Sequence, residues 1–154
     1  MKFAFFYCCL LLNQFAAMSQ EKHDYIKTSQ ELLYAVKTEK PFDSLQRLLA
    51  TASIADLRMQ MGNDDSKKTF WLNIYNAYTQ IALQENPGAY KNRNKFFSHK
   101  FISIGGKNLS LDLVEHGILR RSKWKYSLGY FNKPFVSKFE KQFRMNVNTE
   151  THVD

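Results

Sequence analysis

The sequence predicts a single α+β domain that is mostly helical and carries a small antiparallel hairpin. Of its 154 residues, 44% are hydrophobic and 23% are charged, an ordinary balance for one globular domain. Thirteen Phe, eight Tyr and two Trp supply enough large rings for one core but not for two. Apolar residues recur at helical spacing along most of the chain, and one hairpin pattern interrupts them.

The amino-terminal segment is typical of a secretory signal peptide. Lys2 supplies the charged start, and an apolar run extends from Phe3 to Leu12. Ala17-Met18-Ser19 has the small-x-small spacing of a cleavage site. Because Asn13 and Gln14 interrupt the run, it falls short of the roughly 20 apolar residues that a membrane-spanning helix needs.

We therefore expect residues 1–19 to be a signal peptide, residues 20–154 to form the domain, and the protein to be exported to the periplasm or the extracellular space. A retained anchor or a buried helix is the alternative. Both cysteines, Cys8 and Cys9, lie in the leader. This excludes a disulfide, a thiol nucleophile and a cysteine metal site from residues 20–154.

Four helices are expected before the hairpin, at residues 24–37, about 42–50, 54–61 and about 67–84. The fourth is the central buried helix, since its middle is apolar on nearly every side. Its central stripe is formed by Phe70, Ile74, Ala77 and Ile81. Possible N-caps lie at residues 63–66, and Asn86-Pro87-Gly88 ends the helix.

The second half begins with a basic loop and a hairpin. Phe101–Ile104 and Lys107–Leu109 are the predicted strands, joined by the two-residue turn Gly105-Gly106. Ser110 is the expected N-cap of a helix over Leu111–Arg120. Residues 124–133 are expected to be irregular. Pro134 is then expected to open a last helix whose apolar stripe is Phe135, Phe139 and Phe143.

One carboxylate is expected on an apolar helix face. In a helical-wheel projection of the helix predicted over Leu111–Arg120, Glu115 falls within the apolar face. That face is formed by Leu111, Val114 and Ile118. A buried carboxylate has to be paired or protonated, because leaving it unpaired costs several kcal/mol. We expect a buried polar network that fixes helix packing, and its members would be Asn73, Asn76, Ser110 and Arg120, with Arg121 as a further possible partner of the carboxylate.

The alternative for these residues is a catalytic site. His116 would move a proton and Glu115 would support it. No nucleophile or metal lies beside them in the sequence, and the four histidines form no His-x-x-x-His pair. No phosphate loop, Gly-x-Ser-x-Gly or dinucleotide fingerprint is present, so no metal and no cofactor is expected.

Charge is uneven along the chain. Residues 87–144 hold 13 Lys and Arg against 3 Asp and Glu, whereas residues 20–86 hold 8 against 9. Basic residues interleaved with aromatic ones could bind a polyanion. The candidate polyanion-binding residues are Lys91, Arg93, Lys95, Lys100, Arg120, Arg121, Lys123 and Lys125. Outside the cell, an anionic envelope component or an acidic protein fits better than nucleic acid. A solvated basic face is the alternative.

Two segments carry a resemblance to a known family. They are Phe70-Trp71-Leu72-Asn73-Ile74-Tyr75-Asn76-Ala77 and, after the hairpin, the stretch from Leu109 to Arg120 that contains Glu115-His116. In order and separation they resemble bacterial members of the domain of unknown function 547 family. The resemblance extends from about Leu45 to the end, and Leu128-Gly129-Tyr130 is similar too.

The resemblance also implies a further segment after the aspartate that the present sequence does not contain. Family members follow an aspartate with an arginine-x-histidine-phenylalanine strand and a cysteine-glycine-x-x-serine-cysteine-proline stretch. Here the sequence ends at Val153-Asp154. We therefore expect an incomplete domain without the family's cysteines, which a thiol-based hydrolase or transferase would need beside a histidine.

Three functions follow from these observations. The first is an uncharacterised, non-catalytic or inactive truncated domain with a binding or structural role in the envelope. The second is a cysteine-type hydrolase or transferase whose nucleophile lies beyond residue 154. The third is a polyanion-binding module. The sequence names neither ligand nor substrate, and it leaves the oligomeric state open.

Overall fold

The computed structural model describes residues 23–123, 131 and 134–146, and in these the chain is mostly helical with one two-stranded antiparallel sheet. This confirms the predicted fold class. The predicted signal peptide and, of the predicted irregular segment, residues 124–130 and 132–133 lie outside the described residues. The elements are α2 (Tyr25–Lys37), α3 (Asp43–Ala50), α4 (Ile54–Gln60), α5 (Asp64–Glu85), η2 (Pro87–Lys91), α6 (Arg93–Ser98), β1 (Lys100–Ile104), β2 (Lys107–Ser110), η3 (Leu113–Leu119) and α7 (Lys138–Phe143).

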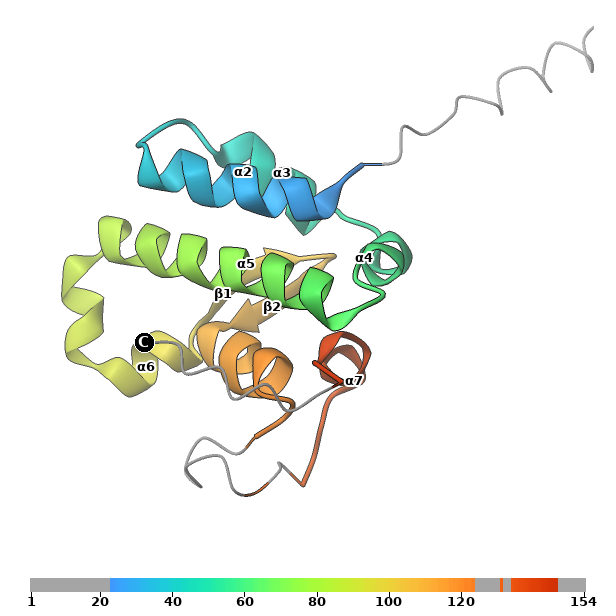
Figure 1. The fold of residues 1–154 in the computed structure, drawn as a ribbon. Coiled ribbons are helices and arrows are strands. Elements are labelled where there is room, and N and C mark those ends of the chain that lie inside the picture. Colours follow the sequence, from blue (N-terminus) through green and yellow to red (C-terminus); the bar gives the residue numbers. More distant parts are fainter. Residues whose placement is uncertain (1–22, 124–130, 132–133, 147–154) are drawn as a thin grey trace, which may run out of the picture.

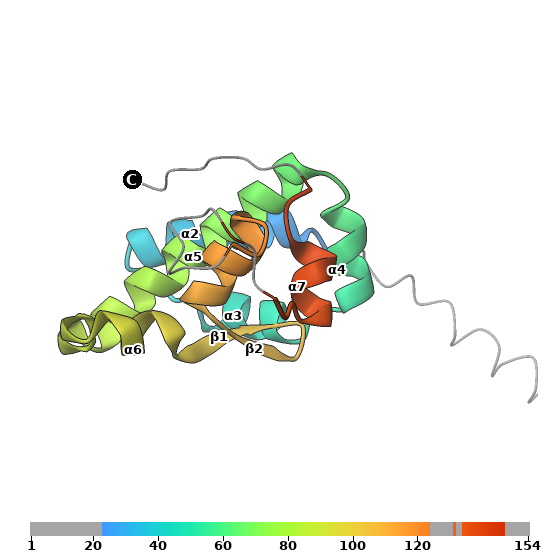
Figure 2. The same ribbon diagram turned by 90° about the horizontal axis from the view of Figure 1, so that it is seen from below.

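Helix α5 crosses the middle of the molecule. Helices α2 and α3 lie on one side of it and η3 on the other, while α6 and α7 lie at its opposite ends (Figures 1 and 2). The predicted stripe of Phe70, Ile74, Ala77 and Ile81 is buried, and so is Trp71. Burial of each such large apolar side chain contributes about 1.5–3 kcal/mol. The prediction of a central buried helix is confirmed.

Polar caps set the ends of α5. Asn63 begins the helix, since its side-chain oxygen accepts a hydrogen bond of 2.8 Å from the backbone N–H of Ser66. Asp64 and Asp65 in the first turn suit the positive end of the helix dipole. The helix ends at Glu85, directly before Asn86 and Pro87, as the breaker sequence predicts.

The hairpin is confirmed and also caps α3. Gly105 and Gly106 have φ angles of 55° and 68°, which favour glycine. Their N–H groups donate to the carbonyl oxygens of Leu49 and Ala50, at 3.0 and 2.7 Å. The Leu49 carbonyl also accepts from Ala52 N at 3.3 Å, and both carbonyls lie at the end of α3, so the turn ties the hairpin to that helix.

The structure of residues 87–98 differs from the predicted basic loop. The predicted basic loop contains two helical turns, η2 and α6. Pro87 stands at the first position of η2, and the Asn92 side chain caps α6 by accepting from Lys95 N at 3.1 Å. Both turns are too short to show an apolar period, which is why the sequence pattern missed them.

The helix predicted over Leu111–Arg120 is present, and most of it is a π-helix. Ser110 caps it, as predicted, by accepting from Leu113 N at 3.2 Å. The wide turns are closed by bonds to residues five positions earlier, such as Arg120 N to Glu115 O at 2.8 Å. Gly117 makes room for α7, because a Cβ atom there would lie 2.9 Å from the carboxyl group of buried Glu140.

The last helix begins later than predicted. Helix α7 starts at Lys138, where the Ser137 side chain accepts from Glu140 N at 3.1 Å. Phe139 and Phe143 pack against Trp71, with ring centroids 6.1 and 5.7 Å away. Phe135 is 92% exposed and lies before the helix, so the prediction that it belongs to the stripe is wrong.

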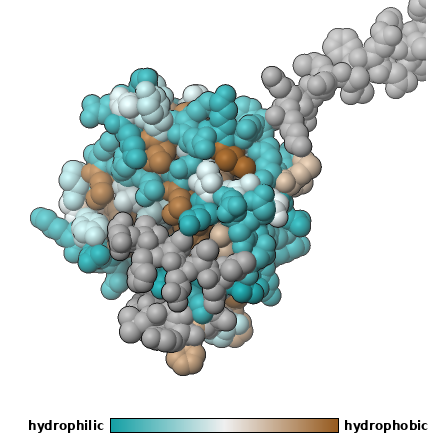
Figure 3. Space-filling model, in the orientation of Figure 1, coloured by the Kyte–Doolittle hydropathy of each residue, from teal (hydrophilic) through white to brown (hydrophobic). Residues whose placement is uncertain are grey.

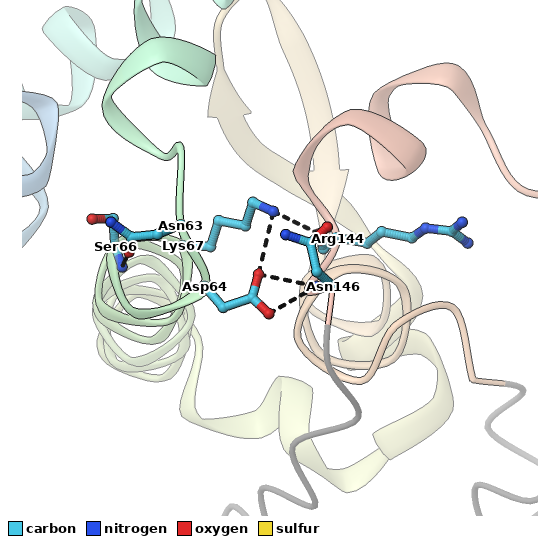
Figure 4. A network of polar contacts seen from close by, with 6 residues as sticks. All are labelled: Asn63, Asp64, Ser66, Lys67, Arg144 and Asn146. Atoms are coloured by element: carbon cyan, nitrogen blue, oxygen red, sulfur yellow. Dashed lines mark hydrogen bonds and ion pairs between the residues drawn. The ribbon is translucent and has the colours of Figure 1, made fainter.

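Two side chains in the first turn of α5 hold the backbone that follows α7 (Figure 4). Both carboxylate oxygens of Asp64 accept from Asn146 N at 3.0 Å. Lys67, which is 6% exposed, donates to the carbonyl of Arg144 at 3.2 Å and lies 3.3 Å from Asp64. Between these contacts Met145 is buried and its N–H donates to the carbonyl of Ile118.

Gly105→Ala should destabilise the fold by about 2–3 kcal/mol. A side chain at positive φ costs about 1–2 kcal/mol, and here the new Cβ would also overlap the Ile54 side chain. Gly106→Ala is the matched control, since it has the same strain but nothing within 4 Å, and it should cost about 1 kcal/mol. Urea unfolding measures both, and equal losses would contradict the packing of the turn against Ile54.

Candidate functional site

A groove of about 540 Å³ lies where the carboxyl end of α5 meets η2, α6 and β1. Its basic lining consists of Lys91 and Lys95, and His99 lies beside them; all three are exposed. Its apolar wall includes Phe96, which is buried, and Phe101, which is half-buried. A concave surface that combines rings and cations is suited to an anionic ligand.

The basic residues predicted for polyanion binding separate into two places. Lys91 and Lys95 line the groove, whereas Arg93 and Lys100 are exposed beside it. The guanidinium of Arg93 lies over the Tyr90 ring, 5.3 Å from its centroid. Among the described residues, no ion pair involves any of these four cations.

The second predicted basic group does not contribute to the groove. Arg120 faces Glu115 and His116, and Arg121 is exposed with a φ of 51°. Lys123 is half-buried, and Lys125 lies outside the described residues. The described members of this group, Arg120, Arg121 and Lys123, therefore do not line the groove.

Four side chains form a polar cluster between α5 and η3. The Tyr75 hydroxyl donates to Glu115 Oε2 at 3.1 Å. Glu115 Oε1 lies 3.9 Å from Arg120 Nη1 and 3.7 Å from His116 Nε2. Arg120 Nη1 lies 3.2 Å from His116 Nδ1, and because a guanidinium can only donate, this nitrogen accepts. A neutral His116 in this cluster therefore carries its proton on Nε2.

The predicted buried network is only partly present. Asn73 Nδ2 donates to Ser29 Oγ on α2 at 3.2 Å, away from Glu115, and Asn76 is exposed. Ser110 serves as the helix cap, while Arg120 does face Glu115. The assignment of Asn76 to a buried network is wrong, and so is the convergence of Asn73 with Glu115.

Tyr75 is the member of this cluster that the sequence reasoning missed. It lies about 200° from Asn73 around the helix, at about 100° per residue, and so it points toward η3 where Asn73 points toward α2. Burial raises the pKa of Tyr75 well above its ordinary value, and the negative charge and hydrogen bond of Glu115 raise it further. The position of Tyr75 on the side of the helix opposite Asn73 could have predicted that it faces a different neighbour.

One of three comparisons with known proteins found a match. A family model described as "Protein of unknown function, DUF547" matches residues 59–152, more than half of the chain. The chain belongs to this family. Neither the curated proteins nor the solved structures contain a match. The DUF547 match spans the groove and the Glu115 cluster, as well as both sequence segments that carry the predicted resemblance.

Neither a membrane-spanning helix nor a metal site is found in the described part of the chain. No helix there is long and apolar enough to cross a bilayer. No group of three or more His, Cys, Asp or Glu side chains there could hold a metal ion.

Tyr75→Phe should reduce the loss of stability at alkaline pH. The pKa of Tyr75 in the folded state lies above its unfolded value of about 10. Its contribution to the free energy of unfolding is therefore complete below about pH 10, and it is lost as the pH rises through the folded pKa. The variant should also lose about 1 kcal/mol at pH 7 with its hydrogen bond to Glu115.

Urea unfolding at pH 7 and pH 11 measures this change. Exposed Tyr34→Phe is the control and should behave like the parent protein. Some alkaline loss should remain in Tyr75→Phe, since burial also raises the pKa of Tyr78. An unchanged pH dependence in the Tyr75 variant would contradict the burial of this hydroxyl.

Proposed function

We propose that this chain is an exported protein that binds an anionic component of the cell envelope and does not itself catalyse a reaction. The observation that carries the proposal is the placement of Lys91, Lys95 and His99 on one groove. Export is supported by the leader-like pattern of residues 1–19.

The electrostatics of the groove support anion binding. Within the described residues neither lysine is neutralised by an ion pair, so both ammonium groups are available to a ligand. Glu85 is the one carboxylate among the lining side chains. The surrounding sequence adds to the attraction, because residues 87–144 carry a net charge of +10.

The exposed surface favours a soluble ligand-binding role over a large apolar interface. In the face drawn in Figure 3, the coloured surface is mostly hydrophilic and the hydrophobic areas are small and separate. Large apolar side chains that are exposed, such as Tyr34 and Met59, come from different helices. Because the drawn face carries no large apolar patch, the charged groove is the better candidate site.

The double variant Lys91→Gln with Lys95→Gln should bind heparin, a soluble polyanion, about thirtyfold more weakly than the parent protein. Each lysine near an anionic surface contributes about 1 kcal/mol, and about 1.4 kcal/mol corresponds to a tenfold change. Calorimetric titration at low salt measures the affinity, which should fall for both proteins as salt is added.

The matched control is Lys37→Gln with Lys107→Gln, which removes two exposed lysines that do not line the groove. It should retain most of the affinity. If the two double variants lose the same amount, binding follows net charge alone and the groove is not the site.

A second candidate function is a hydrolase or transferase that uses His116. It is favoured by the placement of His116 beside Glu115 and Arg120. For His116 to act as a general base, Arg120 would first have to release Nδ1, the nitrogen that accepts its hydrogen bond. Past the leader the sequence offers no thiol, so a cysteine nucleophile would have to come from elsewhere. Ester hydrolysis that is lost in His116→Gln would favour this function over binding alone.

A further inference from the structure

The groove has more apolar wall than charge recognition alone requires. Phe96 is 5% exposed, and Ala82, Ala89 and Phe101 are half-buried along the same surface. A site that only attracts charge can consist of solvated lysines. Here the ammonium groups stand beside a hydrophobic surface that a ligand can cover.

Ring contacts hold this wall in place. The Phe96 ring packs edge-on against Tyr90 and Phe97, with centroids 5.5 and 5.2 Å away. The rings of His99 and Phe101 are stacked, with centroids 5.8 Å apart and planes 24° apart. Rings that are fixed in this way lose little side-chain entropy when a flat group packs against them.

The size and charge of the groove limit the ligand. About 540 Å³ is within the range of about 300–1,000 Å³ that is typical of small-molecule sites. Glu85 offsets one of the two lysines, so these three side chains together carry a charge of about +1. The groove therefore matches a compact ligand with one negative charge better than it matches a long polyanion.

A helix cap also positions one of the two lysines of the groove. The side-chain oxygen of Asn92 is used in capping α6, where it accepts from Lys95 N. This cap fixes the start of the helix that carries both Lys95 and Phe96. A cation and a ring on successive residues of one capped helix are thus presented to the groove together.

From this arrangement we propose that the groove binds a small aromatic monoanion. Its ring packs against Phe96 and Phe101, and its anionic group faces Lys91 and Lys95. The proposal rests on the proposed function, since it names the class of ligand for the same groove. A long polyanion such as heparin would then occupy the site only through one anionic group at a time.

The test compares benzenesulfonate with methanesulfonate, which carry the same fixed charge and differ in the ring. Binding is followed by amide chemical shifts of the folded full chain. Benzenesulfonate should bind at least tenfold more tightly than methanesulfonate, and benzyl alcohol, which has the ring without the charge, should bind more weakly than benzenesulfonate. Equal affinities for the two sulfonates would overturn the proposal.

Variants separate the ring from the charge. Phe101→Leu should lose most of the preference for benzenesulfonate while its affinity for methanesulfonate stays the same. His99→Asn changes an exposed side chain, so it tests the stacked rings without disturbing the core. Tyr34→Leu is the control, since Tyr34 is an exposed ring beside Lys40 but outside the groove. A preference that persists in both Phe101→Leu and His99→Asn contradicts the proposal.

This experiment distinguishes the two levels of the account. If the sulfonates bind equally while heparin binding still depends on Lys91 and Lys95, only the aromatic ligand class is wrong. If heparin binding is indifferent to both lysines and neither sulfonate shifts the amides of the groove, the proposed function fails as well.

Discussion

The burial of α5 on nearly every side is the constraint on which the rest of the structure depends. Its apolar stripe and Trp71 fill the space between α2 on one face and η3 on the other. Two polar side chains in the middle of α5 that face a neighbouring element are each paired with a residue of that element. Asn73 bonds to Ser29 on α2, and Tyr75 bonds to Glu115 on η3.

Each part of α5 also organises a different feature of the surface. Its first turn holds the backbone of residues 144–146 through Asp64 and Lys67. Its middle supplies Tyr75 to the cluster that orients His116. Its carboxyl end, with η2 and α6, forms the cationic groove.

The sequence predicted the features that depend on local pattern. The helix of residues 64–85, the Gly105-Gly106 turn and the Ser110 cap follow from apolar period, positive φ and capping chemistry. The short turns at residues 87–98 did not, because η2 and α6 are too short to show a period and depend on Phe96 reaching the core. The last helix begins after Ser137 and not at Pro134, because the Ser137 side chain caps it and Phe135 stays exposed.

The candidate sites were predicted by residue type but not by location. Glu115, His116 and Arg120 do come together, because they lie on one helical segment. The long-range partner, Tyr75, depends on how α5 is rotated against η3, and the wheel of either helix alone leaves that rotation open. Likewise, the tertiary fold places Lys91 and Lys95 at the groove but not Arg121 and Lys123. The sequence alone does not distinguish these four basic residues.

The most direct test of the account is a map of amide chemical-shift changes when a sulfated disaccharide is added to the isotope-labelled protein. If the anion binds at the groove, the changes should gather at residues 85–101, around the end of α5, and leave residues 105–106 and 115–123 largely unchanged. Changes that gather instead at residues 120–123 would contradict it, because the anion would then bind the other basic group.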